Sequence, residues 1–200
     1  VCVPIGKDDY PQKIFESINA TGAKLTASDL IRNFILMPIK TDLQDKYYDK
    51  YWKRLEQLID SNSKKLEAFF RFFIMAKRMS LINKSAVYRA FTEWYEDNTA
   101  KYGEEGVFKE IVNYASYYNA IYKTPVVSLD SSLQKAVEEF RFILSDMPAP
   151  LLIELYAIHK KVDANGNPCI SAKQLAEIIT ILNSYLMRRS LCGMDTSDIS

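Results

Sequence analysis

The 200-residue sequence contains few of the residues that interrupt helices or build metal and disulfide sites. It has six glycines, seven prolines, three cysteines and one histidine. With so few glycines and prolines, long stretches run uninterrupted between breakers, as helices require and multi-stranded sheets rarely show. The cysteines are odd in number and form no C-x-x-C pair, which argues against a disulfide framework and structural zinc. We therefore expect a reducing, cytoplasmic compartment.

Long hydrophobic runs and a large net charge are also missing. The longest apolar runs, such as 34–37 and 72–76, fall far short of the about 20 residues needed to cross a bilayer. We expect no membrane span, and no signal peptide, because no basic stretch precedes an apolar one near the start. The sequence opens at Val1 without a methionine, so we interpret it as a piece of a longer protein. Lys and Arg number 26 against 25 Asp and Glu, which excludes a protein-wide field for nucleic acid.

The residues that are present predict an all-α fold, a multi-helix bundle of about eight to nine helices. Hydrophobic residues make up 48% and charged residues 26%, as is usual for a packed domain. Helices are expected over 12–20, 26–37, 41–60, 63–79, from 85 to before 103, from after 106 to before 125, from 131 or 132 to about 147, over 151–161 and over 171–189. The segment 63–79 is apolar nearly all round, which indicates a central helix covered by others.

Several local signatures carry these helix predictions. Capping boxes are expected at Thr26 with Asp29, Thr41 with Gln44, and Ser171 with Gln174, and Ser85 is expected to cap a further helix. Apolar residues at helical spacing predict two inward faces, made up of Tyr48, Trp52, Leu55 and Ile59 and of Leu133, Val137, Phe140 and Leu144.

Catalytic and metal-binding motifs are scarce. His159 is the only histidine and no nucleophile motif accompanies it, so we interpret it as a residue that meets the negative end of its helix. The segment 163–167 faintly resembles a calcium loop, but its glycine comes too early and the terminal Glu is absent, which favours a helix-terminating turn. The sequence has no P-loop and no G-x-G-x-x-G. We expect no metal site, no cofactor and no catalytic residues in this chain.

Charge is distributed unevenly along the chain. Residues 64–89 include seven basic residues and one acidic residue, whereas 93–110 include six acidic and two basic residues. Lys64, Arg71 and Arg78 recur every seven residues and share one edge of the central helix, where they could contact DNA phosphates. The alternative, which the sequence favours, is a solvated edge paired with the acidic segment that follows.

One string is specific enough to resemble a known family. Residues 14–33 read I-F-E-S-I-N-A-T-G-A-K-L-T-A-S-D-L-I-R-N and resemble the last motif of the N-terminal domain of GmrSD-type restriction endonucleases, F-E-x-x-N-x-x-G-x-x-L-x-x-x-D-L-x-R-N. The matching residues are Phe15, Glu16, Asn19, Gly22, Leu25, Asp29, Leu30, Arg32 and Asn33. A weaker resemblance covers 185–193, which is similar to the stretch leading into the C-terminal HNH-like nuclease domain of that family.

The resemblance implies an architecture in which this chain is the middle part. Such endonucleases join a ParB/sulfiredoxin-like domain, which hydrolyses nucleotide through D-G-Q-Q-R, to a metal-dependent nuclease by way of helices, and act on modified phage DNA. This sequence has no D-G-Q-Q-R, and one histidine cannot supply an H-N-H site. The resemblance thus implies that 1–38 end the first domain and 39–200 form a helical connector, inactive alone. The parent would use a nucleoside triphosphate and a divalent metal, and the partners would be the flanking domains and DNA.

The resemblance also suggests individual roles. Asn19, Thr21, Gly22, Asp29 and Arg32 would lie near the nucleotide, although the same residues also make a well-built helix–turn–helix corner.

At the other end of the chain, Arg188 and Arg189 would contact DNA or the next domain, or simply satisfy the dipole of the helix that they close. The alternative function is a helical protein–protein interaction module that binds a partner through an open apolar groove.

Overall fold

A computed structural model describes residues 25–125 and 129–194, and this part of the chain is helical with a single isolated bridge between Val162 and Pro168. In chain order the elements are α2 (Ala27–Leu36), α3 (Thr41–Tyr47), a π-helical segment (Tyr48–Trp52), α4 (Lys53–Ile59), α5 (Ser63–Arg78), a 3-10 turn (Lys84–Ala86), α6 (Val87–Tyr122), α7 (Ser131–Ile143), α8 (Ala149–Lys160) and α9 (Ala172–Leu191). The all-α prediction is confirmed.

The number of helices is slightly lower than expected. Since α3, the π-helical segment and α4 follow one another without a break, they form one rod, and the described residues then hold seven helices. The helix expected over 12–20 lies outside the described residues.

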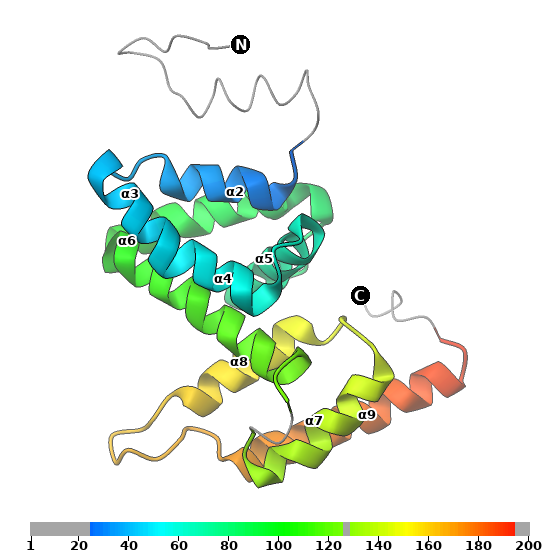
Figure 1. The fold of residues 1–200 in the computed structure, drawn as a ribbon. Coiled ribbons are helices and arrows are strands. Elements are labelled where there is room, and N and C mark those ends of the chain that lie inside the picture. The colour runs from blue at the N-terminus through cyan, green and yellow to red at the C-terminus, as the bar shows by residue number, and fades with distance from the viewer. Residues whose placement is uncertain (1–24, 126–128, 195–200) are drawn as a thin grey trace.

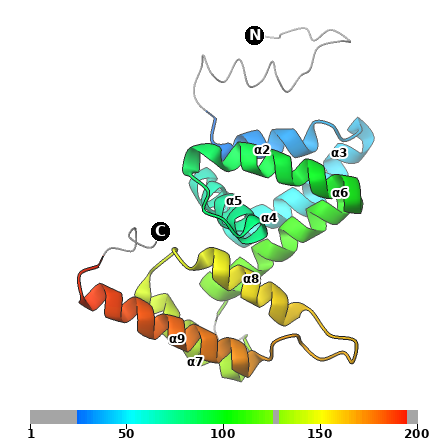
Figure 2. The ribbon, with the colours of Figure 1, turned by 180° about the vertical axis from the view of Figure 1, so that it is seen from behind.

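The helices form two lobes, each with its own hydrophobic core (Figures 1 and 2). The first lobe contains α2 to α5 and most of α6, and the second contains the end of α6 with α7 and α9. Helix α8 lies between them: Ala149, Ile153 and Ala157 are buried in the first core, whereas Leu152 and Tyr156 are buried in the second. Both cores therefore share α6 and α8.

The first lobe is built around α5, as its apolar circumference predicts. Phe69, Phe70, Phe73 and Ile74 are completely buried, and α5 packs against α2, α4, α6 and α8. Helix α2 belongs to this same core through residues such as Ile31. The boundary expected at residue 38 falls between α2 and α3, and the assignment of 1–38 to another domain stays a prediction.

In the second lobe, α7 and α9 lie along each other and bury Leu133, Val137 and Phe140 against Leu175 and Ile179.

The expectation that Leu144 also points inward is wrong. Helix α7 ends at Ile143, and Leu144 adopts a left-handed conformation (φ 53°, ψ 35°) that leaves its side chain 91% exposed. The backbone turn, and not the helical period, sets the direction of this side chain.

Two of the three expected capping boxes are present. Asp29 N–H donates to Thr26 Oγ1 (3.3 Å) and Gln174 N–H donates to Ser171 Oγ (3.2 Å), with the reciprocal bonds formed. The box at Thr41 is wrong: Lys40 stands at the cap position without a side-chain bond, and Gln44 Nε2 donates to Leu36 O instead (2.9 Å).

The cap expected at Ser85 is also wrong. Ser85 lies in the 3-10 turn ahead of α6, and the residue at the cap position of α6, Ala86, has no capping side chain.

The π-helical segment changes which residues of the second rod face the core. Trp52, Leu55 and Ile59 are buried as expected, but Tyr48 is exposed and Tyr51 is buried in its place. A π turn holds one residue more than an α turn, so it shifts the helical phase of everything before it. The stripe predicted from a constant period is therefore wrong at its first residue.

Helix α6 bends once, at Gly103, where φ is 70° and ψ is 166°. Two helices separated by 103–106 were expected, whereas the break is confined to Gly103, and Gly106 lies inside the second half. A glycine tolerates this backbone conformation because it has no Cβ. The bend lets the first half of α6 pack beside α2 while the second half reaches from the first core, at Ile111, to the second, at Ile121.

Candidate interaction surface between the lobes

The residues expected near a nucleotide are only partly described. Asn19, Thr21 and Gly22 lie outside the described residues. Asp29 Oδ2 accepts hydrogen bonds from the backbone N–H (3.2 Å) and hydroxyl (2.6 Å) of Thr26, and Arg32 Nη2 lies 3.9 Å from Asp29 Oδ1. Asp29 thus stabilises the start of α2. Its position near a nucleotide stays a prediction.

The basic strip on α5 makes mainly intramolecular contacts. Arg71 Nε donates to Ile82 O (2.7 Å), and Arg78 Nη2 forms an ion pair with Glu93 Oε2 (2.8 Å). Hydrogen bonds from Arg78 and then Arg89 hold the pKa of Glu93 below its usual range. This geometry agrees with pairing to the acidic segment. Lys64, in the first turn of α5, is exposed and has no ion pair in the described part of the chain. A DNA contact by the strip stays a prediction.

The two arginines of the last turn of α9 also contact their own helix. Arg188 Nε donates to Ser184 O (3.2 Å), and the Arg189 guanidinium lies 5.9 Å from the ring centroid of Tyr185. Cations here face the negative end of the helix dipole. Their contact with DNA or a further domain stays a prediction.

His159 and the 163–167 turn have structural contacts. A ring nitrogen of His159, Nδ1, lies 2.9 Å from Ile170 O, which ties the end of α8 to the chain ahead of α9. Asp163 Oδ1 accepts from the backbone N–H groups of Asn165 (2.8 Å) and Asn167 (2.9 Å), so this carboxylate closes a turn after α8. No group of three or more metal-ligating side chains occurs within the described ranges.

A polar cluster connects α5, α6 and α8, and the sequence alone does not reveal it. Lys77 Nζ donates to the Tyr114 hydroxyl (3.2 Å), which in turn donates to Glu154 Oε2 (2.8 Å). Lys77 also forms an ion pair with Glu110. Burial, followed by the hydrogen bond to Glu154, raises the pKa of Tyr114, so its hydroxyl remains a donor at neutral pH.

A hollow of about 350 Å³ opens beside this cluster, between the end of α5 and the start of α8. We call it the α5–α8 hollow; it is lined by Met75, Ala76, Met79, Ser80, Leu81, Pro150, Leu151 and Glu154. Met79, Leu81 and Leu151 are 91%, 70% and 52% exposed. Glu154 is the only charged residue of this lining.

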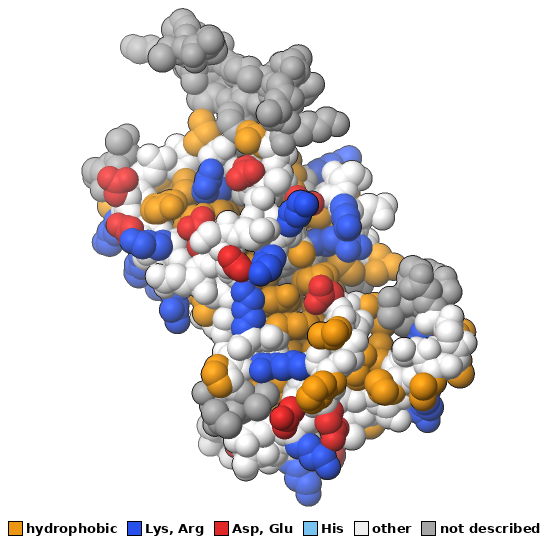
Figure 3. Space-filling view, turned by 45° about the vertical axis from the view of Figure 1, so that its right-hand side comes forward, with side chains coloured by type: hydrophobic (Ala, Val, Ile, Leu, Met, Phe, Trp, Pro, Cys, Tyr) orange, Lys and Arg blue, Asp and Glu red, His pale blue; other side chains and the backbone are white. Residues whose placement is uncertain are grey.

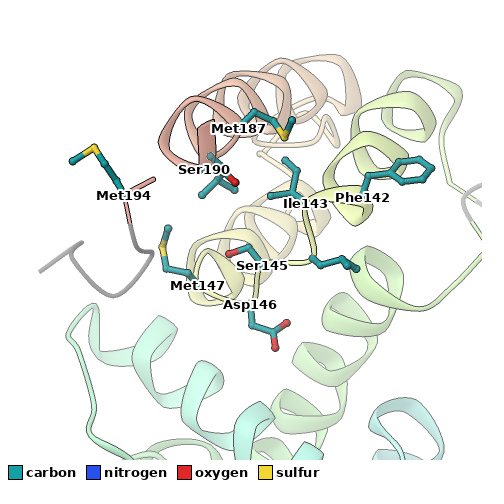
Figure 4. Close-up of a pocket in the computed structure, with 10 residues that line it drawn as sticks. Phe142, Ile143, Ser145, Asp146, Met147, Met187, Ser190 and Met194 are labelled. Atoms are coloured by element: carbon teal, nitrogen blue, oxygen red, sulfur yellow. The ribbon is translucent and has the colours of Figure 1, made fainter. Parts of the chain in front are cut away.

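A second hollow, of about 470 Å³, lies where the ends of α7 and α9 meet the link to α8. Figure 4 shows Met147 and Met194 along one side and Ile143 with Met187 along another, while Asp146 points away from them. Burial raises the pKa of Asp146. The α5–α8 hollow includes the start of α8, and the second hollow includes the link that precedes it. Figure 3 shows hydrophobic side chains gathered between the lobes.

The sequence did contain one signal for this surface. Glu154 is the single charged residue in 147–158, an otherwise apolar stretch. Burial of a lone carboxylate on an apolar helix is unfavourable unless a hydrogen-bond donor or a cation pairs with it. Its partner Tyr114 is forty residues away in the chain, so spacing alone could not identify it.

Comparisons with known proteins identify no relative: no family model, no curated protein and no solved structure matches this chain. Within the described ranges, no helix is both long and apolar enough to cross a membrane.

Proposed function

We propose that this chain is a helical scaffold that holds flanking domains at a fixed separation, in a nucleotide-dependent endonuclease directed against modified DNA. In this proposal the chain carries no complete catalytic centre, and the neighbouring domains provide nucleotide hydrolysis and DNA cleavage. The first part of the proposal rests on geometry, and the second on the resemblance of 14–33 and 185–193.

The observation that carries the scaffold role is the sharing of two helices by both cores. Helix α6 contributes Ile111 to the first core and Ile121 to the second, while α8 contributes Ile153 to the first and Leu152 to the second. A hinge between lobes normally has few contacts across it. Two helices that are buried in both cores give the lobes a defined relative position, as a spacer between working domains requires.

Spin-label distance measurements test this rigidity. With the cysteines replaced by serine, labels at Arg54 on α4 and Lys173 on α9 would report on the two lobes, since both positions are exposed. We expect one distance distribution as narrow as that of a reference pair within the first lobe, Arg54 and Lys101. A distribution clearly broader than the reference would contradict the scaffold role.

The endonuclease assignment has its own test in the surrounding reading frame. We expect D-G-Q-Q-R upstream and an H-N-H-like set downstream of this segment, and finding neither would remove the assignment while leaving the rigidity result intact.

DNA binding is tested by fluorescence anisotropy with duplex DNA over a salt series. Lys64→Gln is the cleanest change, since Arg71 and Arg78 also support the fold. If Lys64 contacts a phosphate, its loss should reduce the salt slope by about 1. Lys101→Gln serves as the control. If the chain does not bind duplex DNA even at low salt, DNA binding would have to be a property of the other domains.

A second candidate function is a helical protein–protein interaction module with no nuclease parent. The apolar surface beside the start of α8 favours it, because exposed apolar patches of this kind commonly bind other proteins.

A further inference from the structure

We propose that the α5–α8 hollow binds a cationic amphipathic segment of a partner protein. An apolar side chain of the partner would enter the hollow, and a lysine or arginine beside it would pair with Glu154. This inference goes beyond the scaffold role and does not depend on the endonuclease assignment.

The apolar rim of the hollow is unusually exposed. Met79, Leu81 and Leu151 present large side chains to water around one depression. Met79 also has left-handed backbone angles (φ 47°, ψ 42°), where glycine is usual. A non-glycine residue in this conformation is strained, because its Cβ comes too close to the following carbonyl oxygen. The chain thus carries a strained, exposed methionine at the edge of the hollow, and methionine adapts readily to a bound apolar surface.

Glu154 provides the charge to which a cation would bind. Its Oε2 accepts from Tyr114, while its Oε1 has no hydrogen-bond partner among the described residues. Glu154 forms no ion pair in that part of the chain, and Lys77, which donates to the same Tyr114 hydroxyl, is paired with Glu110. A half-buried carboxylate on an apolar wall gains much from an incoming cation, since the surrounding low dielectric strengthens the attraction.

The end of α5 adds to the same preference. Met75 and Ala76, in the last turn of α5, line the hollow, and the last turn of a helix is the negative end of its dipole. The two cations in that last turn, Lys77 and Arg78, already have partners in Glu110 and Glu93. The local field therefore favours a cationic partner over DNA or an anionic lipid surface, which would meet like charge at Glu154.

A short helix rich in leucine and lysine is a suitable probe. A labelled peptide of about 14 residues, or four turns, with leucines on one face should bind with a Kd in the micromolar range by anisotropy. A matched peptide with glutamate in place of lysine should bind at least about tenfold more weakly, because its charges repel Glu154.

Variants locate the binding site. Leu151→Asp should weaken binding of the leucine–lysine peptide about tenfold or more, and Glu154→Gln about threefold to tenfold, with the salt dependence reduced. Gln at 154 keeps an acceptor for Tyr114. The matched controls are Ile181→Asp and Glu177→Gln on α9, which should leave binding unchanged; Ile181 is 69% exposed, like the rim residues. Far-UV circular dichroism verifies that each variant folds.

Three outcomes would overturn the proposal. The first is equal binding of the lysine and glutamate peptides, and the second is equal loss of binding in the α9 controls. The third is a chain that dimerises in light scattering and becomes monomeric with Leu151→Asp, which would show that a second copy covers the hollow. Failure of this test would leave the inter-lobe distance result unaffected.

Discussion

The two lobes bury their side chains in different ways. In the first, aromatic rings form a connected network, in which Phe73 lies edge-on to Trp94 (centroids 4.7 Å apart) and Trp52 stacks on Phe70 (5.9 Å). In the second, α7 and α9 bury mainly aliphatic residues around Phe140. Both use helices, yet the first packs its central helix against four others.

The second lobe leaves more of its apolar surface uncovered. Phe142 and Leu191 are 82% and 81% exposed, and Leu144 is 91% exposed. Two helices packed side by side bury only the faces that meet, whereas a helix that packs against several others buries more of its circumference. The comparison shows that the second lobe depends on α6 and α8, which close its core from one side.

The largest expected effect comes from the ring network. Phe73→Ala should lower the free energy of unfolding by about 3–5 kcal/mol, because a completely buried ring leaves a cavity among rigid neighbours. Urea denaturation followed by far-UV circular dichroism measures this. Phe142→Ala, at an exposed ring, should change stability by less than about 0.5 kcal/mol. Comparable losses for both variants would contradict the assignment of the core.

A similar cavity in the second lobe tests whether the two lobes unfold independently. Phe140→Ala should destabilise α7 and α9 by about 3 kcal/mol. Both tryptophans, Trp52 and Trp94, lie in the first lobe. We expect the transition followed by circular dichroism to move to lower urea while tryptophan fluorescence moves less. Coincident shifts would show that the lobes unfold as one unit.

The bend at Gly103 sets the direction of the second half of α6, which is shared by both cores. Gly103→Ala should lower stability by about 1–3 kcal/mol, since its backbone angles are accessible mainly to glycine while no atom lies where a Cβ would stand. Thermal unfolding measures the loss. Gly166→Ala is the control, because it also has a positive φ (81°) but lies in the exposed turn after α8. We expect the bend to be the more sensitive position in the inter-lobe distance measurement.

The polar cluster of Lys77, Tyr114 and Glu154 should contribute less to the free energy of unfolding than the two hydrophobic cores. Tyr114→Phe removes the hydroxyl between Lys77 and Glu154 and should lower stability by about 1–2 kcal/mol, because Glu154 loses its donor. Tyr117→Phe, on the same face of α6, is the matched control and should have a smaller effect. If Tyr114→Phe leaves the stability unchanged, water in the hollow would be replacing the hydrogen bond that Tyr114 donates to Glu154.

The smallest effect concerns acid stability of the first lobe. Hydrogen bonds from Tyr51, Lys50 and Lys109 lower the pKa of Glu105 from 4.5 to about 2. A depressed carboxyl pKa stabilises the fold above the unfolded value and loses that contribution as the pH falls from about 4.5 toward 2. In Glu105→Gln the free energy of unfolding should fall less steeply as the pH decreases, as measured by urea denaturation at a series of pH values. Glu104→Gln, without an ion pair in the described ranges, should leave it unchanged.

Much of the fold could be predicted because its signals are local. Thr26 with Asp29 and Ser171 with Gln174 cap their helices as expected, and the apolar circumference of 63–79 predicted the central helix. Local reasoning failed where the backbone departs from regular geometry. The π-helical segment moved Tyr48 outward, and the left-handed residue Leu144 turned its side chain to solvent.

The candidate surface was less predictable because it depends on tertiary contacts. Tyr114, Lys77 and Glu154 come from three helices that meet only in the folded chain. The exposed rim at Met79 results from a left-handed helix end that no glycine signalled. Conversely, the regular spacing of Lys64, Arg71 and Arg78 suggested a shared basic edge, while folding gave two of these residues intramolecular partners.

The π-helical segment between Thr41 and Ile59 has a consequence for tracing the ancestry of this chain. A π turn holds one residue more than an α turn. A descendant of the same ancestor with a regular helix here would be one residue shorter. A single alignment gap at 48–52, with the flanking core positions in register, would mark where that residue was gained or lost.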